Sequence, residues 1–204
     1  KDTVKVVEDV LANEINAEIV KSINDSGGKA IGLSGNKNTL LSASKLKLEV
    51  KDSDSNIEKL VDIGFVGQPT KVNTNLIEHH IKEGEIPVIA PLGIDHEGNS
   101  YNINADTAAG FIAGELEASK LLLLTDVPGI LDQDKKLISS LTLDDASKII
   151  DEDFIVGGMK PKILTCVEAM KKGVNKTTIL DGRIPHSVVL ELFTEHGIGT
   201  QIYS

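Results

Sequence analysis

The sequence contains few aromatic and sulfur-containing side chains. It has no tryptophan, one cysteine and only 3% aromatic residues among 204. A single cysteine, Cys166, rules out a disulfide within the chain, which fits a reducing cytoplasm. The core must therefore be built from isoleucine, leucine, valine and alanine, and this composition suits a buried parallel sheet covered by helices.

Excess positive charge and long apolar runs are also missing. The formal net charge of −10 argues against a nucleic-acid partner, which would require a basic stripe. No apolar run approaches the ~20 residues needed to cross a bilayer, and no signal-peptide pattern opens the chain. We therefore expect a cytoplasmic protein that binds neither nucleic acid nor membrane. An acidic surface still permits nucleotide binding, because nearby lysines and backbone N–H groups set the field inside a cleft.

Common cofactor and metal motifs do not occur in the chain. Neither G-x-x-x-x-G-K-[ST] nor G-x-G-x-x-G is present, which excludes a P-loop and a Rossmann fingerprint. His79, His80 and His96 have no cysteine or acidic cluster at metal-ligand spacing around them, so we expect solvated histidines and no metal ligands. Cys166 lies among apolar residues and is expected to be a core thiol.

Strand-like and helix-like apolar patterns alternate along the chain, which predicts an α/β fold with a largely parallel sheet. The length suits one domain or one large lobe, and no clear linker is present. The expected helices are 2–11, 15–27, 71–84 (starting at Asn73 or Thr74), 105–116, 143–150, 157–172 and 185–194. The expected strands are 30–33, 60–66, 86–90, 121–125, 177–180 and 199–203, with hairpins at 40–50, 95–99 and 131–137 and a polar loop at 51–56.

Three polar residues, Asn102, Asn104 and Asp106, lie in a loop that leads into a helix of small residues. In open α/β sheets, ligands bind in the loops at the carboxyl ends of strands. Asp106 alone is explained by the helix macrodipole, which favours an acid in the first turn. The two asparagines favour another interpretation, in which the three side chains converge on a small molecule and Asp106 holds lysine ammonium groups around a phosphoryl group.

Thr125 and Asp126 end the most apolar strand of the chain. A carboxylate in this position can bind ribose hydroxyls or the edge of an adenine. It can equally open a turn that Pro128 and Gly129 complete. The residues alone leave both interpretations open.

Lys160 and Lys162 follow Gly157 and Gly158 at the start of a predicted helix. The macrodipole disfavours cations there, so a compensating anion is expected, and phosphate is the natural one. Two solvated lysines are the simpler alternative. Together with the asparagine and aspartate loops, this segment predicts a nucleotide-phosphate site.

These motifs resemble those of the N-acetyl-L-glutamate kinases, a branch of the amino-acid kinase superfamily. The resemblance covers essentially the whole chain. It implies a three-layer αβα sandwich with a mainly parallel central sheet, forming one domain over residues 1–204. Residues 1 to about 100 would be the remainder of an acetylglutamate-binding lobe, and about 101–204 a nucleotide-binding lobe. The matching segments are 32–35, 62–67, 102–106, 123–130, 157–162 and 181–187.

The resemblance also implies the reaction and its site. The γ-carboxylate of N-acetylglutamate would attack the γ-phosphate of ATP, in the second step of arginine biosynthesis, with Mg2+ arriving on ATP. Lys162 and Asp106 would be the catalytic residues. The substrate would contact Asn102, Asn104, Val66 and Gly67, and the nucleotide would contact Thr125, Asp126, Gly129 and Met159.

Family members open with a strand and a glycine-rich loop carrying a first catalytic lysine, and no such segment precedes Lys1. We therefore expect this chain alone to be nearly inactive, because losing one transition-state cation commonly costs ~10²–10³-fold in rate. The alternative is a non-catalytic ATP- or arginine-binding regulatory module of the same fold. Members of the family are homodimers or hexamers, and a homodimer is expected here.

The C-terminal stretch 191–200 resembles the arginine-feedback region of the hexameric, arginine-sensitive branch. By that resemblance Glu191 and Gly197 would contact an arginine effector. Thr178 occupies a position that is often histidine in sensitive members, and this departure weakens the inference.

Overall fold

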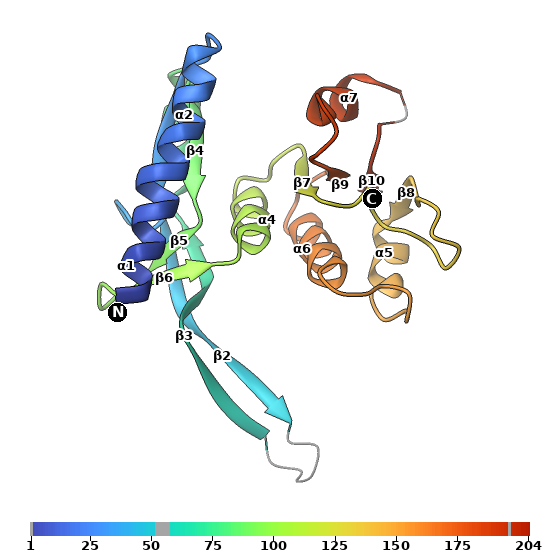
Figure 1. Ribbon diagram of the computed structural model, residues 1–204, viewed down its shortest axis with the longest axis horizontal. Coiled ribbons are helices and arrows are strands. Elements are labelled where there is room, and N and C mark those ends of the chain that lie inside the picture. The colour runs from blue at the N-terminus through green and yellow to red at the C-terminus, as the bar shows by residue number, and fades with distance from the viewer. Residues whose placement is uncertain (1, 52–57, 196) are drawn as a thin grey trace. The chain divides into compact units, whose positions relative to one another are not determined.

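The computed structural model describes residues 2–51, 58–195 and 197–204. Its internal contacts divide the chain into two compact units, Lys1–Ala108 and Ala109–Ser204. In Figure 1 the first unit runs from blue to green and the second from green to red. Both units combine helices with strands, which confirms the predicted α/β class.

The first unit opens with one continuous helical run rather than the two separate helices predicted (Figure 1). It comprises α1 (Asp2–Glu8), a π-helical segment (Asp9–Ile15) and α2 (Asn16–Asp25). The backbone N–H of Asn16 donates to the carbonyl of Leu11, five residues earlier, as a π turn requires. This wider turn brings the buried Asn16 side chain against the neighbouring strands, where its Nδ2 donates to the Val88 carbonyl at 2.8 Å.

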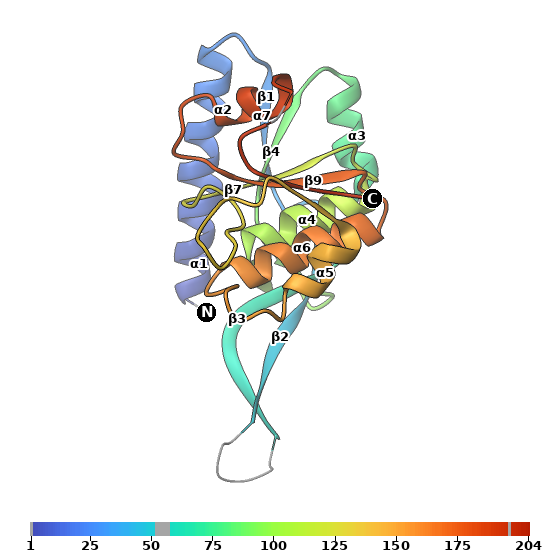
Figure 2. The ribbon, with the colours of Figure 1, turned by 90° about the vertical axis from the view of Figure 1, so that its right-hand side faces the viewer.

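Strands β1 (Ala30–Ser34) and β4 (Ile86–Ala90) pair in parallel and form a two-stranded sheet (Figure 2). Helix α3 (Thr74–Lys82) leads into β4, and Asn73 caps it by accepting a hydrogen bond from the Leu76 N–H at 3.4 Å. The predicted helix start is confirmed. The strand expected at 30–33 is confirmed, and its residues are half-buried except Gly32, which is exposed.

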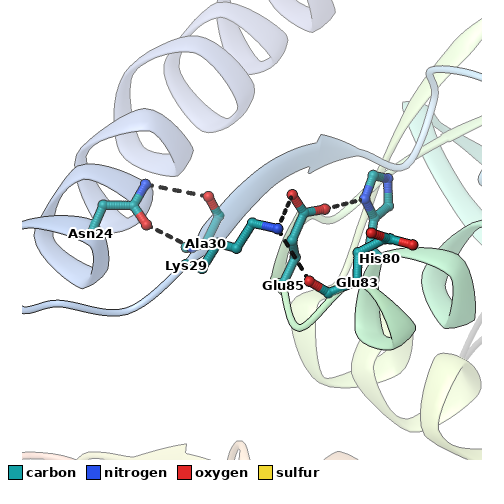
Figure 3. A network of polar contacts seen from close by, with 6 residues as sticks. All are labelled: Asn24, Lys29, Ala30, His80, Glu83 and Glu85. Carbon is teal, nitrogen blue, oxygen red and sulfur yellow. Dashed lines mark hydrogen bonds and ion pairs between the residues drawn. The ribbon is translucent and has the colours of Figure 1, made fainter.

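A network of polar contacts joins the amino ends of β1 and β4 (Figure 3). Asn24 of α2 accepts a hydrogen bond from the Ala30 N–H at 2.6 Å, and Lys29 pairs with Glu85 at 3.5 Å. The Glu85 carboxylate also lies 2.7 Å from Nδ1 of His80. The hydrogen bond with His80 is the main cause of the lowered pKa of Glu85, and Lys29 adds to it. These contacts hold the two strands in register, so that their carboxyl ends lie side by side.

Four strands of the first unit form a closed barrel in the order β2-β3-β6-β5. They are β2 (Leu41–Lys51), β3 (Glu58–Val72), β5 (Leu92–Ile94) and β6 (Ser100–Ile103). The predicted hairpin at 40–50 is wrong, because this segment is a single strand paired with β3. Leu41 and Ala43 are buried and Ser42 and Ser44 are half-buried, the alternation expected of one strand. The polar loop expected at 51–56 lies almost wholly outside the described residues.

The predicted turn at 95–99 is confirmed as the connection between β5 and β6. The Asp95 carboxylate accepts hydrogen bonds from the N–H groups of Glu97 and Asn99, the Asn99 side chain and the Tyr101 hydroxyl. Led by the bond from the Asn99 side chain, these contacts hold the pKa of Asp95 far below its usual range. The charged carboxylate therefore organises the turn.

The second unit contains a mixed sheet in the order β7-β9-β10-β8. Its strands are β7 (Leu121–Thr125), β9 (Lys176–Asp181), β10 (Thr200–Tyr203) and β8 (Ser140–Thr142). Helices α5 (Leu143–Ile149) and α6 (Met159–Lys171) lie side by side beneath it (Figure 2). The remaining helices are α4 (Ala105–Glu115) and α7 (Ser187–Phe193). Ile163, Cys166 and Ile179 are fully buried in the core, which confirms Cys166 as a core thiol.

Within the described ranges, no helix is long and apolar enough to cross a membrane.

Candidate functional site

In the first unit, the barrel brings three of the predicted substrate residues together. Strands β3 and β6 pair in parallel with Val66 opposite Asn102 and Gly67 opposite Ile103. A Cβ atom on Gly67 would lie 2.7 Å from Cβ of Tyr101, so this close approach of the strands requires glycine. Val66, Gly67 and Asn102 thus lie on neighbouring strands although they are distant in sequence.

Asn104 and Asp106, the other two polar residues of the predicted 102–106 loop, lie where β6 passes into α4. The Asn104 side-chain oxygen accepts hydrogen bonds from the Thr107 N–H at 3.1 Å and the Thr107 hydroxyl at 3.3 Å. Asn104 is therefore a helix cap, a role that the sequence interpretation did not include. Asp106 is half-buried in the first turn of α4, where the macrodipole favours its charge.

In the second unit, a pocket of about 240 Å³ opens at the carboxyl end of β7. Thr125 and Asp126 form one side, and Met159 and Lys162 of α6 form another. Gly129 also lines this pocket. The four predicted nucleotide residues and the predicted catalytic lysine therefore share a single cavity.

Most of the remaining pocket lining is apolar and was not anticipated from the sequence. Phe154, Ile155 and Val156 form a wall just before the Gly157-Gly158 pair, and Val127 and Leu131 add to it. Val156 is 71% exposed, which is unusual for valine and marks a surface available to a ligand. An apolar wall facing a lysine suits a molecule with a flat base and an anionic tail. The only local signal was the apolar triplet directly ahead of two glycines.

The cationic side of the pocket lies at the amino end of α6. The first turn of this helix contains no acidic residue, so the Lys162 ammonium group adds to the positive end of the macrodipole. Lys160 instead pairs with Asp151 at 3.1 Å and does not line the pocket. The structure therefore separates two lysines that the sequence could not distinguish without the family resemblance.

The loop that follows β7 and contains the pocket residue Gly129 is fixed by a hydrogen bond to β10. The Thr200 hydroxyl accepts a hydrogen bond from the Ile130 N–H at 2.8 Å. Gly129 has φ of 149°, and a Cβ atom there would lie 2.6 Å from the Thr200 oxygen. Glycine at this position therefore lets the loop close on the sheet.

A second, more polar pocket of about 490 Å³ contains both predicted effector residues, Glu191 and Gly197. Glu191 is buried, and its carboxylate accepts hydrogen bonds from the N–H groups of Ile198 (2.9 Å) and Gly199 (3.3 Å). The Thr178 hydroxyl also donates to it at 3.1 Å. Thr178, the residue that departs from the arginine-sensitive pattern, therefore touches the very carboxylate expected to bind arginine. Lys120 and Lys176 line the same pocket and were not singled out from the sequence.

No group of three or more histidine, cysteine, aspartate or glutamate side chains is arranged for a metal ion within the part of the chain that the structure describes.

Comparison with known protein families matches residues 1–181 to the amino acid kinase family. The chain belongs to the amino acid kinase family. Within this family, the acetylglutamate kinase of Rhodospirillum centenum is 53% identical over 203 residues, which cover 99% of this chain and 66% of that protein. The acetylglutamate kinase of Brucella canis is 54% identical over 200 residues, covering 98% and 68%. These relatives place the chain with the acetylglutamate kinases and confirm the resemblance drawn from its motifs.

A solved structure also resembles this chain. N-acetylglutamate synthase from Neisseria gonorrhoeae, complexed with coenzyme A and L-arginine, matches with a TM-score of 0.72 and 28% identity over 92% of this chain and 43% of that one. The chain spans about two thirds of the length of the two curated kinases. The expectation that it is nearly inactive finds no support in these relatives.

Proposed function

We propose that this protein transfers the γ-phosphoryl group of ATP to the γ-carboxylate of N-acetyl-L-glutamate, forming an acyl phosphate and ADP for arginine biosynthesis. Family membership and identities of 53–54% to acetylglutamate kinases support the reaction. The observation that carries the proposal is the pocket of the second unit, in which Lys162 faces an apolar wall and the Thr125-Asp126 strand end.

The chemistry fits the residues available. A carboxylate nucleophile is already ionised at neutral pH, so no general base is needed, and catalysis reduces to positioning and charge stabilisation. Lys162 would stabilise negative charge on the transferred phosphoryl group. Asp106 would orient the lysine ammonium groups, and Mg2+ would be bound mainly through the ATP phosphates. Acetylglutamate would contact Asn102, Val66 and Gly67, together with the amide nitrogen of Asn104, whose oxygen caps α4.

The finer architecture and assembly belong to the same proposal. A three-layer αβα sandwich with one mainly parallel central sheet stays a prediction from the resemblance, as do the lobe assignments and the cytoplasmic location. A homodimer is proposed as well. The outward face of the first helical run supports it, because exposed apolar side chains recur there at steps of four, five and four residues, matching the π turn: Val6, Val10, Ile15 and Ile19.

Replacing Asp126 by alanine tests the nucleotide pocket. We expect about tenfold weaker binding of Mg2+-ATP, because a charge-assisted hydrogen bond to the ribose or base would be lost. Calorimetry with and without N-acetylglutamate measures this. Asp144→Ala is the matched control, since Asp144 is an exposed acid of α5 outside the pocket and should leave affinity unchanged. Equal affinity for ATP in both variants would exclude Asp126 from the nucleotide site.

A regulatory function through arginine is the second candidate, and the polar pocket around Glu191 supports it. A guanidinium group would pair with the buried carboxylate. The related synthase from Neisseria gonorrhoeae has itself been solved in complex with L-arginine. Titration with L-arginine should release or absorb heat at submillimolar to millimolar concentrations. In Glu191→Gln the signal should disappear, while Glu195→Gln, which changes an exposed acid of the same pocket, should retain it. No heat up to millimolar arginine in the unaltered protein would rule out this function.

A further inference from the structure

Arg183 is the only arginine among the 21 lysine and arginine residues of the chain. Arg183 lies two residues after the end of β9. Asp181, the last residue of that strand, accepts two hydrogen bonds from the Arg183 guanidinium group, one on each carboxylate oxygen. Nε donates to Oδ1 at 2.9 Å and Nη2 donates to Oδ2 at 2.8 Å. The backbone N–H of Arg183 also donates to Oδ1 at 2.9 Å. A lysine cannot make this planar fork, so the position requires the shape of arginine as well as its charge.

The two partners differ in their surroundings. The Asp181 side chain is 8% exposed, whereas the Arg183 side chain is 66% exposed. The hydrogen bonds from Arg183 are the main cause of the lowered pKa of Asp181, so the buried member stays ionised. Asp181 is thus an anchor, and it holds a flat cation whose outer side faces solvent.

The pair lies beside the nucleotide pocket. Strands β7 and β9 are parallel with Thr125 opposite Asp181, and the Gly182 N–H donates to the Thr125 carbonyl at 2.8 Å. Hydrogen bonding and ion pairing with Asp181 raise the pKa of Arg183, and the pocket residue Asp126 adds to the rise. Arg183 therefore stands next to the Asp126 side of the pocket, whereas Lys162 belongs to the α6 side.

We propose that Arg183 is a nucleotide-binding residue that contacts the nucleoside half of ATP and is held in place by Asp181. The inference rests on the proposed function of the pocket. Carboxylates repel phosphate groups, so the triphosphate lies toward Lys162 and the amino end of α6. The ribose and base then lie toward Asp126. A guanidinium fixed in this position offers a flat face to the base and N–H donors to the acceptor atoms of the nucleoside.

Binding of AMP, ADP and ATP tests this assignment. Arg183→Gln should weaken all three by the same factor, about tenfold, because the nucleoside half is common to them. Lys171→Gln, which removes one exposed charge from the last turn of α6, should leave all three affinities unchanged. A loss that grows from AMP to ATP would mean a general charge effect and would overturn the proposal. Unchanged affinities in Arg183→Gln would overturn it as well.

Two further variants separate ligand recognition from folding. Arg183→Lys keeps the charge without the fork and should lose affinity as Arg183→Gln does, at a melting temperature close to that of the unaltered protein. Asp181→Asn keeps the arginine but loosens its orientation and should give a smaller, again uniform, loss. Full affinity in Arg183→Lys would show that the fork has no role in binding. If the unaltered protein bound no nucleotide, the proposed function of the pocket would be refuted. If the unaltered protein and Arg183→Gln bound nucleotide equally well, only the role of Arg183 would be refuted.

Discussion

Replacing Lys162 by alanine is expected to lower the rate of N-acetylglutamate phosphorylation by about 10²–10³-fold. Lys162 lies in the first turn of α6 and lines the pocket proposed for ATP. Its charge adds to the positive end of the helix, and in the proposed transfer both would stabilise the negative charge on the phosphoryl oxygens. Because this stabilisation is greatest in the transition state, the loss should appear mainly in kcat rather than in KM for acetylglutamate.

A coupled assay of ADP release measures this effect, and calorimetry with ATP gives a readout that does not depend on turnover. Lys160→Ala is the matched control, because Lys160 lies two residues earlier and pairs with Asp151 outside the pocket. It should change kcat by less than about twofold, since its ion pair is exposed. If both variants lost activity equally, Lys162 would have no specific part in phosphoryl transfer.

Replacing Gly35 by alanine is expected to destabilise the first unit by about 3 kcal/mol or more. A Cβ atom on Gly35 would lie 1.9 Å from the carbonyl oxygen of Leu92, which belongs to β5 of the barrel. The backbone cannot move away, because the Gly35 N–H donates to the Ala90 carbonyl (3.1 Å) and its own carbonyl accepts from the Leu41 N–H (2.7 Å). The clash therefore acts on backbone atoms that are held by hydrogen bonds on both sides.

Thermal unfolding followed by circular dichroism measures this loss. Gly158→Ala is the control, because Gly158 has φ of −72° and a Cβ atom there would meet nothing within 4 Å. Its cost should stay below about 1 kcal/mol, the range of a helix-cap change. A melting temperature for Gly35→Ala within about 2 °C of the unaltered protein would show that the loop at 34–40 relaxes freely.

Local signals predicted most of the elements correctly. The start of α3 at Asn73 and the turn at 95–99 both depend on side chains that bond to backbone groups within four residues. Such contacts can be identified in a short window of sequence. The prediction of two separate helices over 2–25 was wrong, because the two form one continuous run. Asn16, in the middle of this run, bonds to carbonyls of Leu33 and Val88, which are 17 and 72 residues away and give no local signal.

In the candidate site, too, local motifs were predicted correctly and contacts between remote segments were not. Thr125, Asp126, Gly129, Met159 and Lys162 were named from motifs, and the structure brings all five into one pocket. The apolar wall at 154–156 was missed because it has no regular spacing and no polar residue to mark it. For the predicted substrate residues Val66, Gly67 and Asn102, no local pattern predicts that β3 and β6 become neighbours.

The sequence by itself determined the α/β class, the order of most strands and helices, the family and the residue types at the strand ends. These features depend on periodicity, caps and motifs within short stretches of chain. Only the tertiary structure decided which of those residues meet. Gly129 closes on Thr200, and Thr178 bonds to the buried Glu191, because strand pairing and packing bring together backbone segments that are remote in the chain.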